Sequence, residues 1–478
     1  AGILTPKEML EGFSNKGMIT VALLFLVSEG IRQSGTLGQV IKKLLPQGKT
    51  TVFKAQLRIL PSVAFISAFL NNTPVVVIFA PIIKHWAKSV NLPATKFLIP
   101  LSYVTILGGI CTLIGTSTNL VVHGMILEAG FEGFSMFELG KVGIFIAIAG
   151  IIYIFLFSKR LLPDARPDTA VPDEEVEEGE KLHRVEAVLG ARFPGINKKL
   201  KDFNFQRHYG AEVKEIKTRN GQRFVTNLDD VVLHEGDTLV VMADDTFIPT
   251  WGESSVFVLL TNGNEPDTTG KKKRWFALLL LVLMIVGATV GELPVTKEMF
   301  PDIKLDMFFF VSITTIIMAW TNLFPARKYT KYISWDILIT IACAFAISKA
   351  MVNSGVADSV AKFIIGLSDD YGPHVLLAMV FIITNLFTEL ITNNAAAALA
   401  FPLALSISAQ LGVSPTPFFV VICMAASASF STPIGYQTNL IVQGIGNYKF
   451  TDFVRIGLPL NIITFLISII LIPLIWNF

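Results

Sequence analysis

The pair Asn71-Asn72 interrupts an apolar stretch over residues 59–83, and the pair Asn393-Asn394 interrupts a second one much later in the chain. An amide without a hydrogen-bond partner in hydrocarbon costs several kcal/mol, so each pair must line water or bind something. We predict that the two asparagine turns face each other around a transported solute. The alternative is that each pair only satisfies the backbone of a bent helix.

The composition indicates a polytopic α-helical membrane protein. Of 478 residues, 52% are hydrophobic and only 16% are charged, and apolar runs near the ~20 residues that cross a bilayer recur throughout. The candidate spans are 17–34, 59–86, 97–127, 142–157, 275–290, 307–320, 333–351, 375–409, 418–445 and 456–476. The runs 59–86 and 375–409 are too long for one straight helix, and we predict a re-entrant hairpin for each. Breaks at Gly115 and Gly435 divide 97–127 and 418–445.

Between the two membrane parts the composition changes. Prolines and an acidic run characterise residues 161–183, which we interpret as a solvated linker. Residues 184–262 alternate short apolar runs with turns, including the hairpin signal Asn220-Gly221, and we predict a small soluble α+β domain there. A second linker covers 263–274. The membrane parts are then 1–160 and 275–478.

The two membrane parts resemble each other. The segment from Gly115 to Asn119 recurs as Gly435 to Asn439, and interrupted helices in matching positions are the best sequence pointer to a secondary transporter's binding site. We predict two inverted repeats, each with a hairpin and a broken helix. Two spans precede the second repeat but not the first, so we expect N-terminal helices of the first repeat to be missing from this sequence.

Charge gives the expected orientation. Lysines and arginines flank the first hairpin at 42–58 and 84–96, whereas Lys362, Asp369 and Asp370 precede the second. The excess of positive charge predicts a cytoplasmic opening for the first hairpin and an external one for the second. The soluble domain is then cytoplasmic, and the expected location is a bacterial-type plasma (inner) membrane.

The breaks carry chemistry without charged side chains. A helix that ends inside the membrane exposes N–H groups that favour an anion or carbonyl groups that favour a cation. The asparagine amides add donors and acceptors, Gly115 and Gly435 let the backbone bend, and Thr118 and Thr438 add hydroxyls. No arginine or lysine lies near either break. This chemistry suits a small anion together with Na⁺ held by oxygens.

These hairpins and the loops that end in Thr118-Asn119 and Thr438-Asn439 resemble the divalent anion:sodium symporters. In that family each hairpin tip carries Ser-Asn-Thr, which touches substrate and sodium. The matching triplets begin here at Asn71 and Asn393; both keep the central asparagine, each serine is an asparagine, and the second threonine is Ala395. These departures weaken the inference of a dicarboxylate substrate.

The family's sodium sites also use a hydroxyl four residues before each triplet. That position is Ser67 in the first half and Glu389 in the second, and the resemblance implies that Glu389 ligates sodium or takes up a proton in its place. The alternative is a structural ion pair with Lys349. The candidate substrate residues are Asn71, Asn72, Thr73, Asn393, Asn394, Ala395, Thr118, Asn119, Thr438 and Asn439. The candidate sodium ligands are Ser67, Asn71, Asn72, Gly115, Glu389, Asn393, Asn394 and Gly435.

The soluble segment resembles a TrkA-C (RCK-C) domain, in the stretches Leu200 to Ile216 and Leu233 to Val241. Such domains dimerise and in some proteins bind a regulatory nucleotide; an assembly module without ligand is the alternative. Family members with this insertion are often associated with sulfate or other inorganic anions. The resemblance therefore implies sodium-coupled uptake of a small divalent oxyanion, above all sulfate, by an elevator-type homodimer in the lipid bilayer. A sodium-coupled dicarboxylate transporter, a membrane anion sensor and an RCK-gated ion channel remain alternatives. We expect neither an enzyme nor a nucleic-acid partner, because the sequence has no phosphate-binding loop, zinc-ligand helix or nucleophile elbow.

Overall fold

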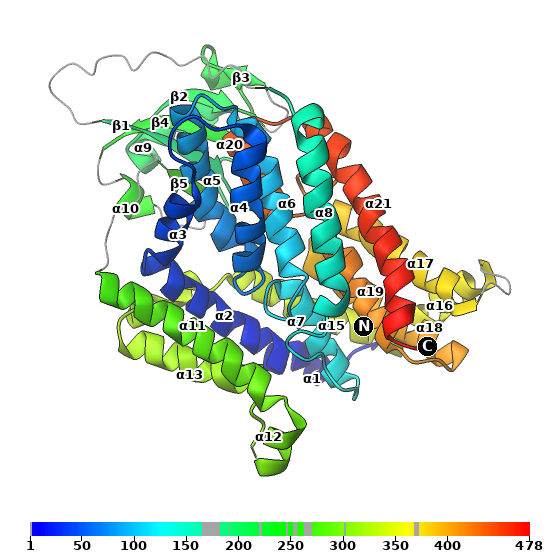
Figure 1. Ribbon diagram of the computed structural model, residues 1–478. Coiled ribbons are helices and arrows are strands. Elements are labelled where there is room, and N and C mark those ends of the chain that lie inside the picture. Colours follow the sequence, from blue (N-terminus) through cyan, green and yellow to red (C-terminus); the bar gives the residue numbers. More distant parts are fainter. Residues whose placement is uncertain are drawn as a thin grey trace.

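The structure, a computed structural model, describes residues 2–164, 182–190, 192–218, 222–244, 247–251, 256–261, 270–300, 303–367 and 372–478. A large helical body carries a small sheet at one end (Figure 1). Within the described residues, six helical segments are long and apolar enough to cross a membrane: Pro6–Gln33, Gly140–Leu161, Lys271–Gly291, Gly372–Leu390, Asn393–Leu411 and Phe450–Ile475. The chain is therefore an integral membrane protein of the helical class.

Eight α-helices precede the sheet. They are α1 (Pro6–Glu11), α2 (Lys16–Gln33), α3 (Thr36–Leu44), α4 (Val52–Ser67), α5 (Asn72–Ser89), α6 (Leu98–Gly109), α7 (Ser117–Glu128) and α8 (Gly140–Leu161). Side-chain caps define several starts: Asn15 Oδ1 accepts from the Gly17 amide at 2.8 Å before α2, and Thr51 caps α4. The first asparagine pair forms the turn between α4 and α5, and the break around Gly115 separates α6 from α7.

The helices after the sheet surround the second asparagine pair. They are α11 (Lys271–Gly291), α12 (Pro294–Met299), α13 (Met307–Trp320), α14 (Tyr329–Tyr332), α15 (Trp335–Asn353), α16 (Val356–Leu367), α17 (Gly372–Leu390), α18 (Asn393–Leu411), α19 (Thr416–Ser427), α20 (Gln437–Gly446) and α21 (Phe450–Ile475). The pair Asn393-Asn394 opens α18 directly after α17, and the break around Gly435 separates α19 from α20. Each asparagine pair thus joins two helices, and each glycine break divides two more.

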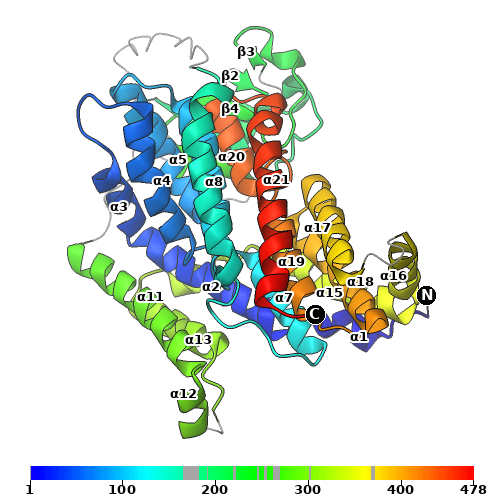
Figure 2. The same ribbon diagram turned by 45° about the vertical axis from the view of Figure 1, so that its right-hand side comes forward.

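The helices that end at the breaks lie in the core, and two long helices lie outside them. Every residue of α6 is buried, as is α19 from Pro417 to Ser427. Helices α8 and α21 pack against each other along the outside of the body (Figures 1 and 2). Both expose large apolar side chains, among them Ile148 and Ile462. Apolar surfaces of this kind are stable in contact with lipid, so we place α8 and α21 at the bilayer. The breaks, which adjoin the buried helices α6 and α19, lie at the centre of the protein.

The segment between the membrane parts forms a five-stranded antiparallel sheet in the order β3-β2-β4-β1-β5. Its strands are β1 (His183–Leu189), β2 (Glu212–Lys217), β3 (Arg223–Phe224), β4 (Thr238–Ala243) and β5 (Phe257–Thr261), with the short helices α9 (Phe205–Tyr209) and α10 (Phe247–Trp251). Its own core is aromatic, with Phe193 in contact with Phe203 and Phe257.

Some predicted features lie outside the described residues. Strands β2 and β3 pair as expected, with Ile216 opposite Phe224, but the predicted turn at Asn220-Gly221 is not among the described residues. The same holds for 165–181 and 262–269, which make up most of the two predicted linkers, and for Asp369 and Asp370. The domain boundaries at 184 and 262 stay predictions.

Candidate functional site

Four helices begin at the asparagine turns and the glycine breaks, and their first residues meet. These helices are α5, α7, α18 and α20, which begin at Asn72, Ser117, Asn393 and Gln437. Helices α5 and α20 pack together, as do α7 and α18. Each asparagine turn therefore meets the glycine break of the other half of the chain.

The first contact joins the first turn to the second break. Asn72 Oδ1 accepts from Ser67 Oγ at 2.7 Å, and Asn72 Nδ2 donates to the Tyr436 hydroxyl at 2.6 Å. Thr116 Oγ1 lies 3.0 Å from the same hydroxyl, and Thr73 Oγ1 donates to Gln437 at 3.3 Å. The Tyr436 hydroxyl of the second break thus joins the first turn to the first break.

The second contact joins the second turn to the first break. Asn394 Oδ1 accepts from Ser117 Oγ and Thr118 Oγ1, both at 3.2 Å. Its amide nitrogen donates to no group in the described part of the chain, because every hydrogen bond of this side chain involves Oδ1. Asn394 therefore keeps two N–H groups available for a ligand.

Helix ends set the electrostatics of this centre. The starts of α5, α7, α18 and α20 direct free N–H groups and the positive ends of their dipoles towards it, which favours an anion. Helices α4, α6, α17 and α19 end at the same turns and breaks, so their free carbonyl groups favour cations there. None of the hydrogen-bond partners given above is a lysine or an arginine. The centre therefore has the means to hold an anion and small cations with neutral groups.

The two break asparagines hold their own loops. Asn119 Nδ2 donates to the carbonyl oxygens of Gly109 (3.5 Å) and Thr112 (2.9 Å). Asn439 Nδ2 donates in the same way to those of Ser429 (2.8 Å) and Thr432 (3.1 Å). The amide nitrogens of both predicted substrate residues thus point at the backbone and fix the shape of each break. Thr438, in contrast, accepts from Ser102 Oγ of α6 at 2.8 Å, beside the start of α20.

Glycine at 115 and 435 lets oxygens approach. A Cβ on Gly115 would lie 2.5 Å from the Gly109 oxygen and 3.0 Å from the Ala68 oxygen. A Cβ on Gly435 would lie 2.0 Å from Ser429 Oγ and 2.4 Å from the Thr388 oxygen. Both breaks therefore bring oxygens close to a glycine, and the oxygens at Gly115 are backbone oxygens that a side chain could not displace cheaply.

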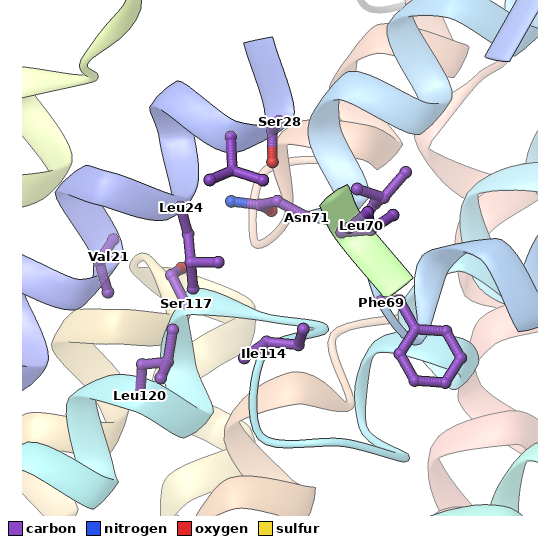
Figure 3. A pocket seen from close by; sticks show the side chains of 11 residues that line it. Val21, Leu24, Ser28, Phe69, Leu70, Asn71, Ile114, Ser117 and Leu120 are labelled. Carbon is purple, nitrogen blue, oxygen red and sulfur yellow. The ribbon is translucent and has the colours of Figure 1, made fainter. Parts of the chain in front are cut away.

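The remaining turn residues have different surroundings. Asn71 points towards Ser28 of α2, across a cavity that also borders Ser117 and has room for about one water molecule (Figure 3). The Asn393 side chain lies near the Tyr436 hydroxyl. Ala395 is half-buried and brings no polar group. The first residues of the two triplets thus have different neighbours: Asn71 faces Ser28, and Asn393 faces Tyr436.

Glu389 faces the second break and the last helix. Its Oε1 accepts from the Ser431 amide at 2.9 Å and from Asn461 Nδ2 of α21 at 2.7 Å, and its Oε2 lies 3.5 Å from Ser429 Oγ. Lys349, the alternative partner considered from the sequence, makes no ion pair with Glu389 in the described part of the chain. The Glu389 carboxylate is therefore bound by neutral donors and sits beside the oxygens around Gly435.

Three residues of this centre are not among the candidates from sequence. They are Tyr436, Ser102 and Asn461, which bind Asn72, Thr438 and Glu389. Asn461 could have been found as a polar residue within a 26-residue membrane helix, since such residues mark functional positions. Ser102 gives a weaker signal of the same kind. Tyr436 gives none, because its partner Asn72 is 364 residues away.

Comparison with known proteins agrees with this architecture. A family model described as "Citrate transporter" matches residues 1–410 and 303–477. An uncharacterized transporter of Synechocystis sp. is 30% identical over all of this chain and 91% of its own length. In Chlamydomonas reinhardtii, a probable sodium/sulfate cotransporter 3 is 23% identical over 96% of this chain and 82% of its own length, and sodium/sulfate cotransporter 2 is 31% identical over 59% of this chain and 31% of its own length. The chain belongs to the citrate transporter family, which is a family of membrane transporters and not of enzymes.

Proposed function

We propose that this member of the citrate transporter family is a secondary active transporter that couples Na⁺ to the uptake of a small divalent oxyanion, sulfate. The observation that carries the proposal is the meeting of four helix N-termini at the two asparagine turns, with the free amide nitrogen of Asn394 among them. A tetrahedral dianion offers an oxygen in several directions at once, which suits donors that arrive from four helices. The names of the relatives in Chlamydomonas reinhardtii support sulfate and sodium.

Substrate contacts in this proposal come from the turns and the helix starts. Asn72, Thr73, Asn394, Thr118 and Thr438 lie at the meeting point, whereas Asn119 and Asn439 act by holding the breaks in shape. Binding by neutral donors keeps the anion's charge uncompensated unless cations arrive with it. This gives a physical reason for coupling to Na⁺.

Sodium would bind at the two oxygen clusters. The first lies around Gly115, beside Ser67 and Asn72, and the second around Gly435, beside Glu389. The two clusters differ in charge, because only the second has a carboxylate. The second site is therefore the one whose occupancy depends on whether Glu389 is ionised, which would allow a proton to replace one sodium ion.

We further propose that the two halves are inverted repeats with re-entrant hairpins, and that the protein is an elevator-type homodimer of a bacterial-type inner membrane. The recurring helix order and the matched hydrogen bonds of Asn119 and Asn439 support the repeat. The distribution of lysine and arginine supports a cytoplasmic sheet domain of TrkA-C type. A regulatory nucleotide on that domain stays a proposal from the resemblance alone.

One observation favours a second substrate class. The matching family model is described as a citrate transporter, so a sodium-coupled transporter of citrate or a dicarboxylate is the competing proposal. The turns here lack one hydroxyl, at Ala395, and carry amides at Asn71 and Asn393. Amides are donors that a compact oxyanion and a carboxylate both accept, so competition must decide.

The test is uptake of radiolabelled sulfate into proteoliposomes with and without an inward sodium gradient. We expect accumulation that needs the gradient and that unlabelled sulfate suppresses more than succinate or citrate. If citrate or succinate suppresses uptake at a lower concentration than unlabelled sulfate does, the protein is a citrate or dicarboxylate transporter instead. Conductance without accumulation would indicate a channel, and binding without uptake a sensor; either would overturn the proposal.

A further inference from the structure

The sheet domain contacts the membrane body at the far ends of two helices that begin in the candidate site. Helix α5 begins at Asn72 and carries Lys84 three turns later, roughly 18 Å along its axis. Helix α20 begins beside Thr438 and carries Gly444 near its other end. These ends lie beside the sheet in both views (Figures 1 and 2).

The contact on α5 is an ion pair. Lys84 Nζ lies 2.9 Å from both carboxylate oxygens of Glu186 on β1, and the two side chains are only 21% and 16% exposed. No aspartate or glutamate occurs anywhere in residues 30–127. The first half therefore gives Lys84 no acidic partner within that stretch, and the sheet provides one.

The same carboxylate is held firmly from within the sheet. Lys217 Nζ, 3% exposed, lies 3.3 Å from Glu186 Oε1. Burial by itself raises the pKa of Glu186, but Lys84 and Lys217 outweigh it and lower the pKa to about 2. Glu186 is therefore ionised at physiological pH, where it can pair with both lysines.

The contact on α20 is close packing at two glycines, one on the sheet and one on the helix. Gly236, with φ of +84°, packs against the Leu440 side chain, whose Cδ1 would lie 2.5 Å from a Cβ placed at Gly236. A Cβ on Gly444 would lie 2.6 Å from Thr238 Oγ1 and 3.3 Å from the Gly236 oxygen. At both glycines the helix and the sheet are closely packed, and a side chain added at either position would collide with Leu440 or Thr238.

We propose that the sheet domain is fastened to α5 and α20 and moves with them as one body during transport, with Glu186 as a positioning residue for the asparagine turn at the other end of α5. This proposal depends on the proposed transport function only where uptake is the quantity measured. Its consequence is that whatever holds the sheet domain still also holds the two helices that carry Asn72 and Thr438. The sheet domain is then a rigid part of the unit that carries the substrate, and not a separate domain joined to it only by linkers.

The first experiment removes the pair and uses a neighbour as control. Lys84→Met and Glu186→Gln should each lower the uptake rate about threefold or more at unchanged protein level in the membrane. Lys88→Met is the matched control, because Lys88 is one turn further along α5, exposed, and makes no ion pair in the described part of the chain. Equal loss in all three variants, or loss in none, contradicts the proposal.

The second experiment restores the attachment by other means. Lys84→Cys and Glu186→Cys are combined in a chain whose native cysteines, Cys111, Cys343 and Cys423, are replaced by serine or alanine, and a short reversible dithiol cross-linker is applied. Cross-linking should raise uptake relative to the untreated double variant, and reduction should reverse the gain. A merely structural defect would not respond to the cross-linker in this way.

Cross-linking that stops uptake would show that the domain must separate from α5 in the cycle, and the proposal would be wrong. The yield of cross-link provides a readout that needs no transport, and it should be the same with and without Na⁺ and sulfate. A yield that falls when they are added also contradicts attachment throughout the cycle. If the wild-type protein fails to transport sulfate, the proposed function fails, while the yield still tests the attachment.

Discussion

Replacing Asn394 by aspartate tests whether a negatively charged substrate binds beside this side chain. The side chain keeps its size, and an Asp oxygen still accepts the hydrogen bonds that Ser117 and Thr118 donate at 3.2 Å. What changes is the free amide nitrogen, which becomes a negatively charged oxygen. We therefore expect the fold to be preserved and anion binding to be lost.

The magnitude follows from two effects. A hydrogen bond to a charged group contributes about 1.5–3 kcal/mol, and Asn394→Asp removes it. A carboxylate about 4 Å from one unit of negative charge costs about 4 kcal/mol at an effective dielectric constant of 20. Together they exceed about 5 kcal/mol, which is more than about a thousandfold in affinity. Asn394→Ser removes the amide nitrogen without adding charge, and the shorter side chain should weaken binding of the anion by about 10- to 100-fold.

The assay is the KM for sulfate in sodium-driven uptake, measured at saturating sodium with the amount of reconstituted protein held equal. Asn91→Asp, an exposed asparagine after the far end of α5, controls for an added negative charge. If the aspartate and serine variants raise KM equally, the anion does not lie beside Asn394. That result would refute the argument from the helix starts.

Three further predictions test the ion sites and the domain contact. Gly115→Ala should raise the sodium concentration needed for half-maximal uptake or prevent folding, because its Cβ meets two backbone oxygens, whereas Gly366→Ala, with no atom within 4 Å, should be silent in the same assay. Glu389→Gln should change the dependence of uptake on sodium and pH, and unchanged coupling across both titrations would remove Glu389 from the ion sites. The Glu186 pKa is lowered, so its contribution of about 3 kcal/mol is present above its usual value of 4.5 and lost as pH falls towards about 2; thermal unfolding of the detergent-solubilised protein should show this acid loss, and Lys84→Met should reduce it.

The sequence predicted where the helices end better than it predicted which residues the side chains at those ends contact. Polar pairs inside apolar runs have a local cause, so the turn before Asn72 and the breaks at Gly115 and Gly435 could be placed without a structure. The direction of a side chain at a break is not local. Asn119 looked like a substrate ligand, yet its amide holds two carbonyl oxygens of its own loop.

Partners between distant segments were the least predictable. Charge alone suggested Lys349 for Glu389, but helix packing brings Asn461 and Ser431 to that carboxylate instead. The pairing of Lys84 with Glu186 could not be read from either segment, although the absence of acidic residues in 30–127 indicated that the lysine would find its partner elsewhere.

The most direct test of the central claim is anomalous diffraction from crystals of the protein grown with sodium and selenate, a heavier analogue of sulfate. The account predicts one selenium peak per chain between the starts of α5, α7, α18 and α20, within hydrogen-bond reach of Asn72 or Asn394. A peak among the lysines at 42–49, or full uptake activity with no peak at the four helix starts, would contradict it.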